Sequence, residues 1–267
     1  MMEPLFPQWE KLAAELRKAA HVLLLSDYDG TLTPIVSRPE KARLSPEVRE
    51  SLRRLAAKPD FTVGIVSGRM LEEIRGMVGI PGIYYAGNHG LEISGPGLEY
   101  RNPAALAAQS QVKDLGHQLK ARLSIIPGAW VEDKGLSLSV HYRQVREEQV
   151  STAEELFCGV TAPLVRSGKI RVTSGKKVWE VRPPIDWDKG KAAETIRQEI
   201  TKLRRLPRLP AIYLGDDTTD EDAFRVISPP EGWSIYIGAG SDDSTAAYCV
   251  DSPAEVALFL SRLLALR

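Results

Sequence analysis

Two acidic residues in the polar turn DYDGT, Asp27 and Asp29, have the types and the spacing of a phosphoryl-transfer pair. Asp27 can attack phosphorus as a nucleophile, while Asp29 can protonate a leaving oxygen and later deprotonate water. The turn follows an apolar run at residues 22–25, which is too short for a globular helix but long enough for a buried parallel strand. Ligands of open α/β sheets bind at the carboxyl ends of such strands. An Asx-turn that caps the strand would contain the same residue types. Residues elsewhere in the chain must therefore distinguish a catalytic pair from a structural turn.

Three further segments carry polar groups that suit the same chemistry. Carboxylates from two loops can hold Mg²⁺ through hard oxygen ligands, while a serine and a lysine can bind phosphate oxygens and offset charge during transfer. Taken alone, each of these groups is more simply explained as part of a turn, as a helix cap or as a solvated lysine. The occurrence of all four segments in the required order, however, is far less frequent by chance than that of any one of them. The groups are Ser67 in SGR, Lys189 in DKG, and Asp216, Asp217 and Asp220 in GDDTTDE.

The segments that position these groups alternate between apolar strands and helices. Helices are expected after the Ser45-Pro46 cap, at residues 70–78 and after Asp188. This alternation predicts an α/β fold with a doubly wound parallel sheet, in which the strand ends lie along one edge and bring the four groups together. Besides residues 22–25, the strands are expected at 61–66, 83–86, 211–214 and 234–237.

Between residues 105 and 182 strands and helices no longer alternate one by one, which predicts an inserted α+β cap domain. The core domain would then consist of residues 1–104 and 183–267. The cap is expected to run helix, two strands, helix, hairpin, with the hairpin turn at Ser174-Gly175. Its helices are expected at 105–123 and 147–159, and its strands at 129–133, 135–142, 169–173 and 176–182.

Alternation with a period of two gives the cap sheet two different faces. Leu138 and Val140 share one face of their strand, while Ser139 and His141 share the other, and Glu180 lies opposite its apolar neighbours in the last strand. We expect the apolar face to lie under the two helices and the polar face to be wet, as in a substrate cap. His141 and Arg143 on the polar face are assigned to positioning rather than to chemistry.

The composition excludes several classes of protein. Thirty-five basic and thirty-five acidic residues cancel among 267, so nothing suggests a nucleic-acid partner. No signal peptide or membrane-spanning run is visible. Cys158 and Cys249 lack metal-ligand neighbours and are expected to be buried, reduced thiols. The chain is therefore expected to be cytoplasmic, with no membrane partner.

The motifs DxDGT, SGR, DKG and GDDxTDE together resemble those of the haloacid dehalogenase superfamily of phosphatases. Within it, DYDGTLTP, VSGR, GNHGLE, VEDK…HYR, VWEVRP, DKGKA and GDDTTDEDAF resemble the trehalose-6-phosphate phosphatase family over nearly the whole chain. The third motif reads DKG where NKG is commoner, which leaves the lysine intact.

The resemblance implies a role for each matching residue. Asp27 would be the nucleophile and Asp29 the general acid/base. Asp27, the main-chain oxygen of Asp29 and Asp216 would ligate Mg²⁺, with Asp217 or Asp220 in support. The other residues expected in the site are Ser67 and Lys189 for phosphate, Gly30, Thr31, Arg69, Asn88, His89 and Gly90 along its lining, and Glu132, Lys134 and Glu180 in the cap for the sugar.

The resemblance also implies an activity, the Mg²⁺-dependent hydrolysis of trehalose 6-phosphate to trehalose and phosphate. A sugar phosphatase of the same architecture that acts on sucrose 6-phosphate or mannosyl-3-phosphoglycerate is the nearest alternative, because only the cap separates these substrates. A non-catalytic regulatory domain that partners a synthase is an alternative from another class, which the intact acids argue against. A monomer and a possible trehalose-6-phosphate synthase partner are expected.

Overall fold

The computed structural model describes residues 2–36, 38–238 and 243–266. The chain divides into two compact units, the first made of Met1–Tyr100 and Trp187–Arg267 and the second of Arg101–Asp186. Each unit has its own sheet and its own hydrophobic core. Among the described helices, none combines the length and the hydrophobicity that a membrane-spanning segment requires.

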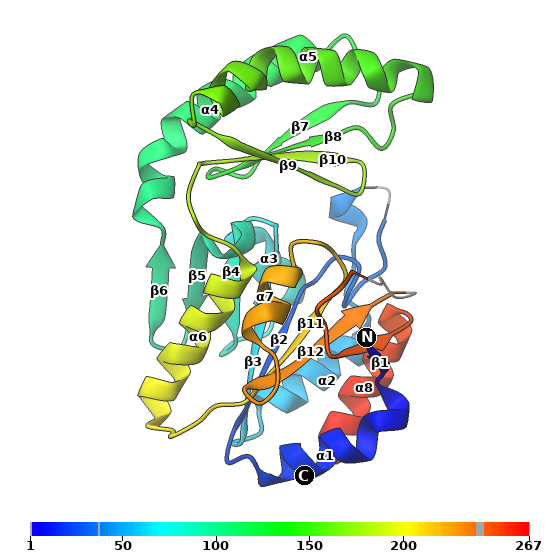
Figure 1. Ribbon diagram of the computed structural model, residues 1–267, viewed down its shortest axis with the longest axis vertical. Helices are drawn as coiled ribbons and strands as arrows, with labels where there is room; N and C mark the ends of the chain where they lie inside the picture. Colours follow the sequence, from blue (N-terminus) through cyan, green and yellow to red (C-terminus); the bar gives the residue numbers. More distant parts are fainter. Residues whose placement is uncertain (1, 37, 239–242, 267) are drawn as a thin grey trace. The chain divides into compact units, whose positions relative to one another are not determined.

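The first unit is built on a large sheet with β2 near its middle (Figure 1). From β2 the chain moves to β3 and β4 on one side, then returns through β11 and β12 on the other. In the spatial order given below, all neighbouring strands from β1 at one edge of the sheet to β4 are parallel. Strand β5 is antiparallel to β4. The expected α/β fold with a doubly wound parallel sheet is thus confirmed. In spatial order the strands are β1 (Glu3–Pro4), β13 (Tyr248–Val250), β12 (Gly232–Ile237), β11 (Ala211–Gly215), β2 (Val22–Ser26), β3 (Phe61–Val66), β4 (Tyr84–Gly87), β5 (Glu92–Gly95) and β6 (Leu98–Arg101).

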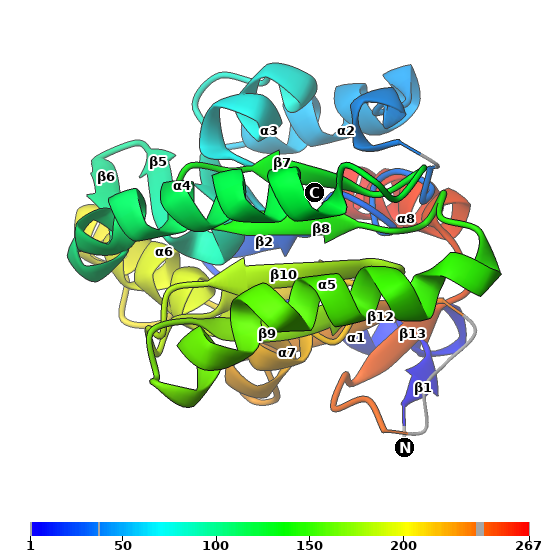
Figure 2. The same ribbon diagram turned by 90° about the horizontal axis from the view of Figure 1, so that it is seen from above.

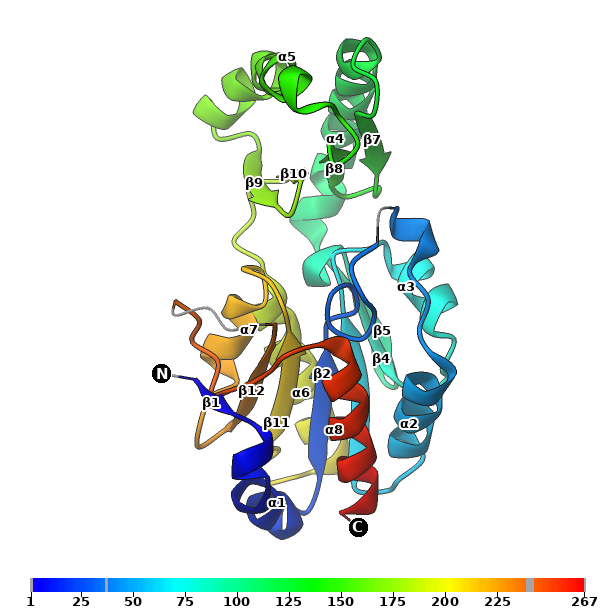
Figure 3. The same cartoon turned by 90° about the vertical axis from the view of Figure 1, so that its right-hand side faces the viewer.

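Helices cover both faces of this sheet (Figure 3). Strand β2 serves both faces, because Val22 and Leu24 belong to one core cluster while Leu23 and Leu25 belong to the other. The continuous apolar run at residues 22–25 is therefore explained by a strand that is buried on both faces of the sheet. The first cluster includes side chains of α1 (Trp9–Lys18), α2 (Pro46–Ala56), α3 (Leu71–Val78) and α8 (Pro253–Ala265), and the second includes those of α6 (Lys189–Arg204) and α7 (Glu221–Val226).

The helices begin where the sequence supplies caps. Ser45 accepts a hydrogen bond from the amide of Val48 at 3.1 Å, and Pro46 occupies the first turn of α2. At the start of α6, the carboxylate of Asp188 accepts from the amide of Lys191 at 2.8 Å. This cap fixes the first residue of α6, which is Lys189.

The second unit is a four-stranded sheet covered on one face by two helices (Figure 2). Its apolar face lies under the helices as expected, since Leu138, Val140 and Trp179 share a buried cluster with Phe157 of the second helix. In chain order the elements are α4 (Pro103–Leu123), β7 (Trp130–Asp133), β8 (Leu138–His141), α5 (Glu147–Arg166), β9 (Arg171–Gly175) and β10 (Val178–Arg182).

Several expectations about local structure were wrong, including the strand expected at 135–142, which spans only Leu138–His141. Helix α5 continues past Gly159 to Arg166, because the buried stripe of Ala153 and Phe157 extends to Thr161. The hairpin turn lies two residues later than expected, at residues 176–177, since Gly175 still pairs with β10. Ser139 on the polar face is only 1% exposed. Finally, the two cysteines are not buried: Cys158 is exposed and Cys249 is half-buried.

Candidate active site

Three neighbouring parallel strands end in the residues that the sequence singled out. Asp27 follows β2, Ser67 follows β3 and Asp216 follows β11. Strand β2 lies between the other two, with Ser26 paired to Leu214 on one side and to Ile65 on the other. The amide of Asp27 donates to the carbonyl oxygen of Leu214 at 2.8 Å. The register of the sheet therefore brings the residues that follow these three strands to the same edge of the sheet.

The ammonium group of Lys189 joins two carboxylates at this edge. Its Nζ lies 3.2 Å from Oδ1 of Asp27 and 2.8 Å from Oδ1 of Asp220. All three side chains are at most 7% exposed. A buried charge is costly unless it is paired and hydrogen-bonded, so each member of this group depends on the others.

Asp220 accepts hydrogen bonds on both of its oxygens. Lys189 and the hydroxyl of Tyr213 each donate to Oδ1 at 2.8 Å. The amides of Asp216 and Asp217 donate to Oδ2 at 3.0 and 3.2 Å. Asp220 thus fixes the loop after β11, the lysine and the tyrosine at once.

The electrostatics of the group follow from its burial. Burial raises the pKa of Asp27 well above its ordinary value, although the Lys189 ammonium opposes the shift. Burial likewise raises the pKa of Asp220 to about 7 against the same ammonium. Burial alone would lower the pKa of Lys189, but Asp220 and Asp27 outweigh it and raise it. For Asp217, Lys189 and hydrogen bonds from Thr219 overcome burial and lower the pKa to about 2.

A divalent cation fits this edge. Ligand oxygens of Asp27, Asp216 and Asp220 lie within 4.8 Å of one another, and all three residues are buried. Hard carboxylate oxygens are the ligands that Mg²⁺ and Ca²⁺ take in proteins. A bound cation would also favour the ionised forms of carboxyl groups whose pKa burial raises.

The turn between Asp27 and Thr33 brings the main chain close to Asp216. The amides of Leu32 and Thr33 both donate to the carbonyl oxygen of Tyr28, and the hydroxyl of Thr31 donates to Oδ1 of Asp216 at 3.1 Å. Gly30 has φ +88°, and a Cβ atom there would lie 2.2 Å from Oδ2 of Asp216. Glycine is therefore required at this position for both its conformation and its size.

The segment after β4 packs against the SGR turn. The amide of Asn88 donates to the carbonyl oxygen of Arg69 at 2.7 Å, and the amide of His89 donates to that of Ser67 at 2.9 Å. The hydroxyl of Ser67 in turn accepts from the amide of Arg69 at 3.2 Å. Gly90, with φ +91°, packs against α6. Main-chain hydrogen bonds thus connect the segments that follow β3 and β4.

The sugar-binding candidates cluster within the second unit. Glu132 and Glu180 flank Ser139 from the two neighbouring strands, which explains the burial of that serine. The ammonium of Lys134 lies 3.6 Å from Glu180, and Arg182 pairs with the same carboxylate. This cluster is defined by Glu132, Lys134, Ser139, Glu180 and Arg182 and is called the cap cluster below.

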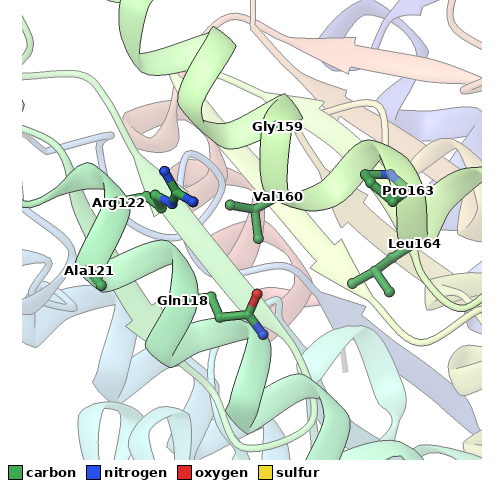
Figure 4. A pocket seen from close by; sticks show the side chains of 7 residues that line it. All are labelled: Gln118, Ala121, Arg122, Gly159, Val160, Pro163 and Leu164. Carbon is green, nitrogen blue, oxygen red and sulfur yellow. The ribbon is translucent and has the colours of Figure 1, made fainter.

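A pocket of about 530 Å³ elsewhere in the second unit contains none of the expected site residues. It lies between α4 and α5 (Figure 4), and its side chains include Gln118, Arg122, Val160 and Leu164. The candidate site is defined by converging charged groups rather than by this pocket.

Comparison with known proteins decides the family. A sequence model of the trehalose-phosphatase family matches residues 25–254. This chain belongs to the trehalose-phosphatase family. The resemblance expected from the motifs is thereby confirmed, and so is its assignment to an enzyme family.

Individual relatives agree with this trehalose-phosphatase assignment. The chain is 37% identical over 260 residues to the probable trehalose-phosphate phosphatase D of Arabidopsis thaliana, covering 94% of this chain and 69% of that protein. It is 40% identical over 245 residues to the trehalose-phosphate phosphatase of Mycobacterium bovis, covering 89% of this chain but 60% of the relative. The C-terminal domain of C. albicans trehalose-6-phosphate phosphatase superposes with a TM-score of 0.82 at 25% identity, with 100% of both chains covered.

Besides Arg182 of the cap cluster, two residues of this trehalose-phosphatase chain were missed by the sequence analysis. Tyr213 binds Asp220, but a tyrosine within the buried strand β11 has the pattern of an ordinary core residue. Trp130 stacks on His141 with ring centroids 4.0 Å apart, and Oε2 of Glu132 lies 2.7 Å from Nε2 of that histidine. Trp130 and Glu132 lie two residues apart and therefore on the same face of β7. This spacing is the only sequence signal that could have indicated the contact between Trp130 and His141.

Replacing Gly30 with alanine should destabilise the first unit and lower activity. The new Cβ atom would meet the Asp216 carboxylate and would hold an alanine at positive φ, which together cost roughly 1–3 kcal/mol. Urea unfolding measures the first effect and phosphate release the second. Gly76→Ala in α3 is the matched control, because nothing lies within 4 Å of its Cβ position, so that variant should gain up to about 1 kcal/mol. Equal stability of the two variants would contradict the expected crowding at Gly30.

Proposed function

We propose that this chain hydrolyses trehalose 6-phosphate to trehalose and inorganic phosphate through an aspartyl-phosphate on Asp27, with Mg²⁺ as the cation. The observation that carries the proposal is the convergence of Asp27, Lys189 and Asp216 at one sheet edge in a member of the trehalose-phosphatase family. The names of its relatives support the substrate.

The proposed reaction has two displacements at phosphorus. In the first, a carboxylate oxygen of Asp27 attacks phosphorus, the bond to the sugar oxygen breaks, and Asp29 gives its proton to that oxygen. In the second, water attacks the aspartyl-phosphate while Asp29 takes its proton. The bond between phosphorus and Asp27 breaks, which releases phosphate and restores both carboxyl groups.

Lys189 and Ser67 are assigned to the phosphoryl group. The ammonium of Lys189 is held beside Asp27 by Asp220, so its charge is already in place when negative charge shifts on the transferred group. Asp27, Asp216 and the main-chain oxygen of Asp29 would hold Mg²⁺. When bound, the cation would offset the charges of phosphate and nucleophile.

The second unit is proposed to act as the cap that selects the sugar. The cap cluster offers carboxylates that accept, and ammonium and guanidinium groups that donate, hydrogen bonds to sugar hydroxyls. Sucrose 6-phosphate and mannosyl-3-phosphoglycerate remain alternative substrates, which a panel of sugar phosphates would separate. The regulatory alternative explains neither the paired acids of the DYDGT turn nor Asp216. The cytoplasmic location, the monomeric state and the synthase partner stay predictions.

Asp27→Asn should lower the rate of phosphate release by at least about 10³-fold, because the amide cannot form the covalent intermediate. Phosphate release from trehalose 6-phosphate measures the loss, and thermal unfolding checks that the fold persists. Near-wild-type turnover in a folded variant would contradict the proposed nucleophile.

Chelation by EDTA should abolish activity, and excess Mg²⁺ should restore it. Ca²⁺ should inhibit, because its higher and looser coordination would misplace the attacking oxygen. The same titration on Asp216→Asn should show little restoration, since that variant lacks a proposed ligand. Full activity after exhaustive dialysis against chelator would rule out the metal assignment.

Glu180→Ala should weaken the hydrolysis of trehalose 6-phosphate far more than that of p-nitrophenyl phosphate. A charge-assisted hydrogen bond to the sugar is worth roughly 1.5–3 kcal/mol, or about 10- to 100-fold in kcat/KM. Glu147→Ala is the matched control, because Glu147 forms an exposed ion pair with Lys177 in the same unit. Equal losses on both substrates would mean that the cap cluster does not recognise the sugar.

A further inference from the structure

The guanidinium group of Arg69 is surrounded by acceptors of the first unit. Its Nε and one terminal nitrogen donate to the two carboxylate oxygens of Asp29 at 2.7 and 2.8 Å. The same terminal nitrogen donates to the carbonyl oxygen of Pro39 at 2.8 Å, and the other terminal nitrogen pairs with the carboxylate of Glu73. Four of the five N–H groups of this guanidinium are therefore committed within the protein.

These contacts do not suit a residue that binds substrate phosphate. We expected Arg69 to line the site, but its side chain is only 5% exposed. Its Cζ lies 5.7 Å from the ring centroid of Tyr28. A phosphate group would find at most one N–H group of this buried guanidinium without a bound acceptor.

The carboxylate of Asp29 depends on this arginine for its orientation. Its side chain is 39% exposed, so packing restricts its rotation little. The turn that follows Asp27 fixes the main chain, since the amide of Gly30 donates to the carbonyl oxygen of Thr33 at 2.8 Å. The two-point pairing with Arg69 fixes the plane of the carboxylate, which a single hydrogen bond would leave free to turn.

We infer that Arg69 is a positioning residue that holds Asp29 for its acid–base role. The inference rests on the proposed function, in which Asp29 protonates the sugar oxygen and later takes a proton from water. Arg69 transfers no proton itself and contacts no phosphate. Its effect should therefore appear in the steps in which Asp29 gives or takes a proton.

Two aryl esters separate positioning from binding. Phenyl phosphate needs a proton on its leaving oxygen much more than p-nitrophenyl phosphate does, and neither carries a sugar. The value of kcat/KM reports events up to the phosphorylation of Asp27, so hydrolysis of the intermediate does not enter it. In Arg69→Lys, which keeps the charge but loses the two-point geometry, kcat/KM for phenyl phosphate should fall roughly 10- to 100-fold. For p-nitrophenyl phosphate it should change by less than about threefold.

Pre-steady-state kinetics give a second readout. Activation of water also needs Asp29, so the aspartyl-phosphate should accumulate in Arg69→Lys. A burst of p-nitrophenolate, stoichiometric with the enzyme, should then precede a slower steady state. A merely structural role for Arg69 predicts equal losses on both esters and no burst, and that result would overturn the inference.

Two variants serve as controls. Glu73→Gln removes another partner of the same guanidinium without touching Asp29, so it should keep the wild-type ratio between the two esters. Asp29→Asn should show the same selective loss on phenyl phosphate as Arg69→Lys, but larger. If Asp29→Asn lacks that selectivity, the proposed acid–base role itself fails; if it shows the selectivity and Arg69→Lys does not, only the positioning role fails.

Discussion

The buried ion cluster of Lys189 with Asp27 and Asp220 is the constraint on which the site depends. Several carboxylates meet at the end of three strands, where their mutual repulsion and their desolvation would both oppose folding. The lysine offsets these costs because the cap at Asp188 and the buried face of α6 place its ammonium between two of the acids. The ammonium group of Lys189 that stabilises the folded loop is also the group that is proposed to bind the phosphoryl group in the reaction.

The strand-end rule made much of the site predictable. Asp27, Ser67 and Asp216 each follow a recognisable apolar strand, and parallel topology alone brings such positions to one edge. The doubly wound parallel sheet, the strand buried on both faces and the inserted α+β unit likewise follow from hydrophobic periodicity and from the order of strands and helices along the chain. The family resemblance added roles for single residues, which spacing cannot give.

The remainder could not be predicted, because it depends on contacts between distant segments. Strand β1 is two residues long and pairs with β13 near the other end of the sequence, so local propensity carries no signal for it. The bond between Tyr213 and Asp220 and the fourfold engagement of Arg69 depend on side-chain geometry that a sequence pattern does not encode. Residues such as Arg69 were therefore assigned to the site without their true partners.

The four hydrogen bonds of Asp220 have a consequence for how such a fold can change over generations. A lineage that gave up phosphate release could replace Asp29 at a smaller cost, because its side chain is 39% exposed and the guanidinium of Arg69 would keep Glu73 and the carbonyl oxygen of Pro39 as acceptors. It could not replace Asp220 as easily, because Lys189, Tyr213 and the amides after β11 would all lose their acceptor. Inactive descendants should thus keep the acid at position 220 long after the acid at position 29 has drifted, which makes the pair a record of whether catalysis or only the fold was under selection.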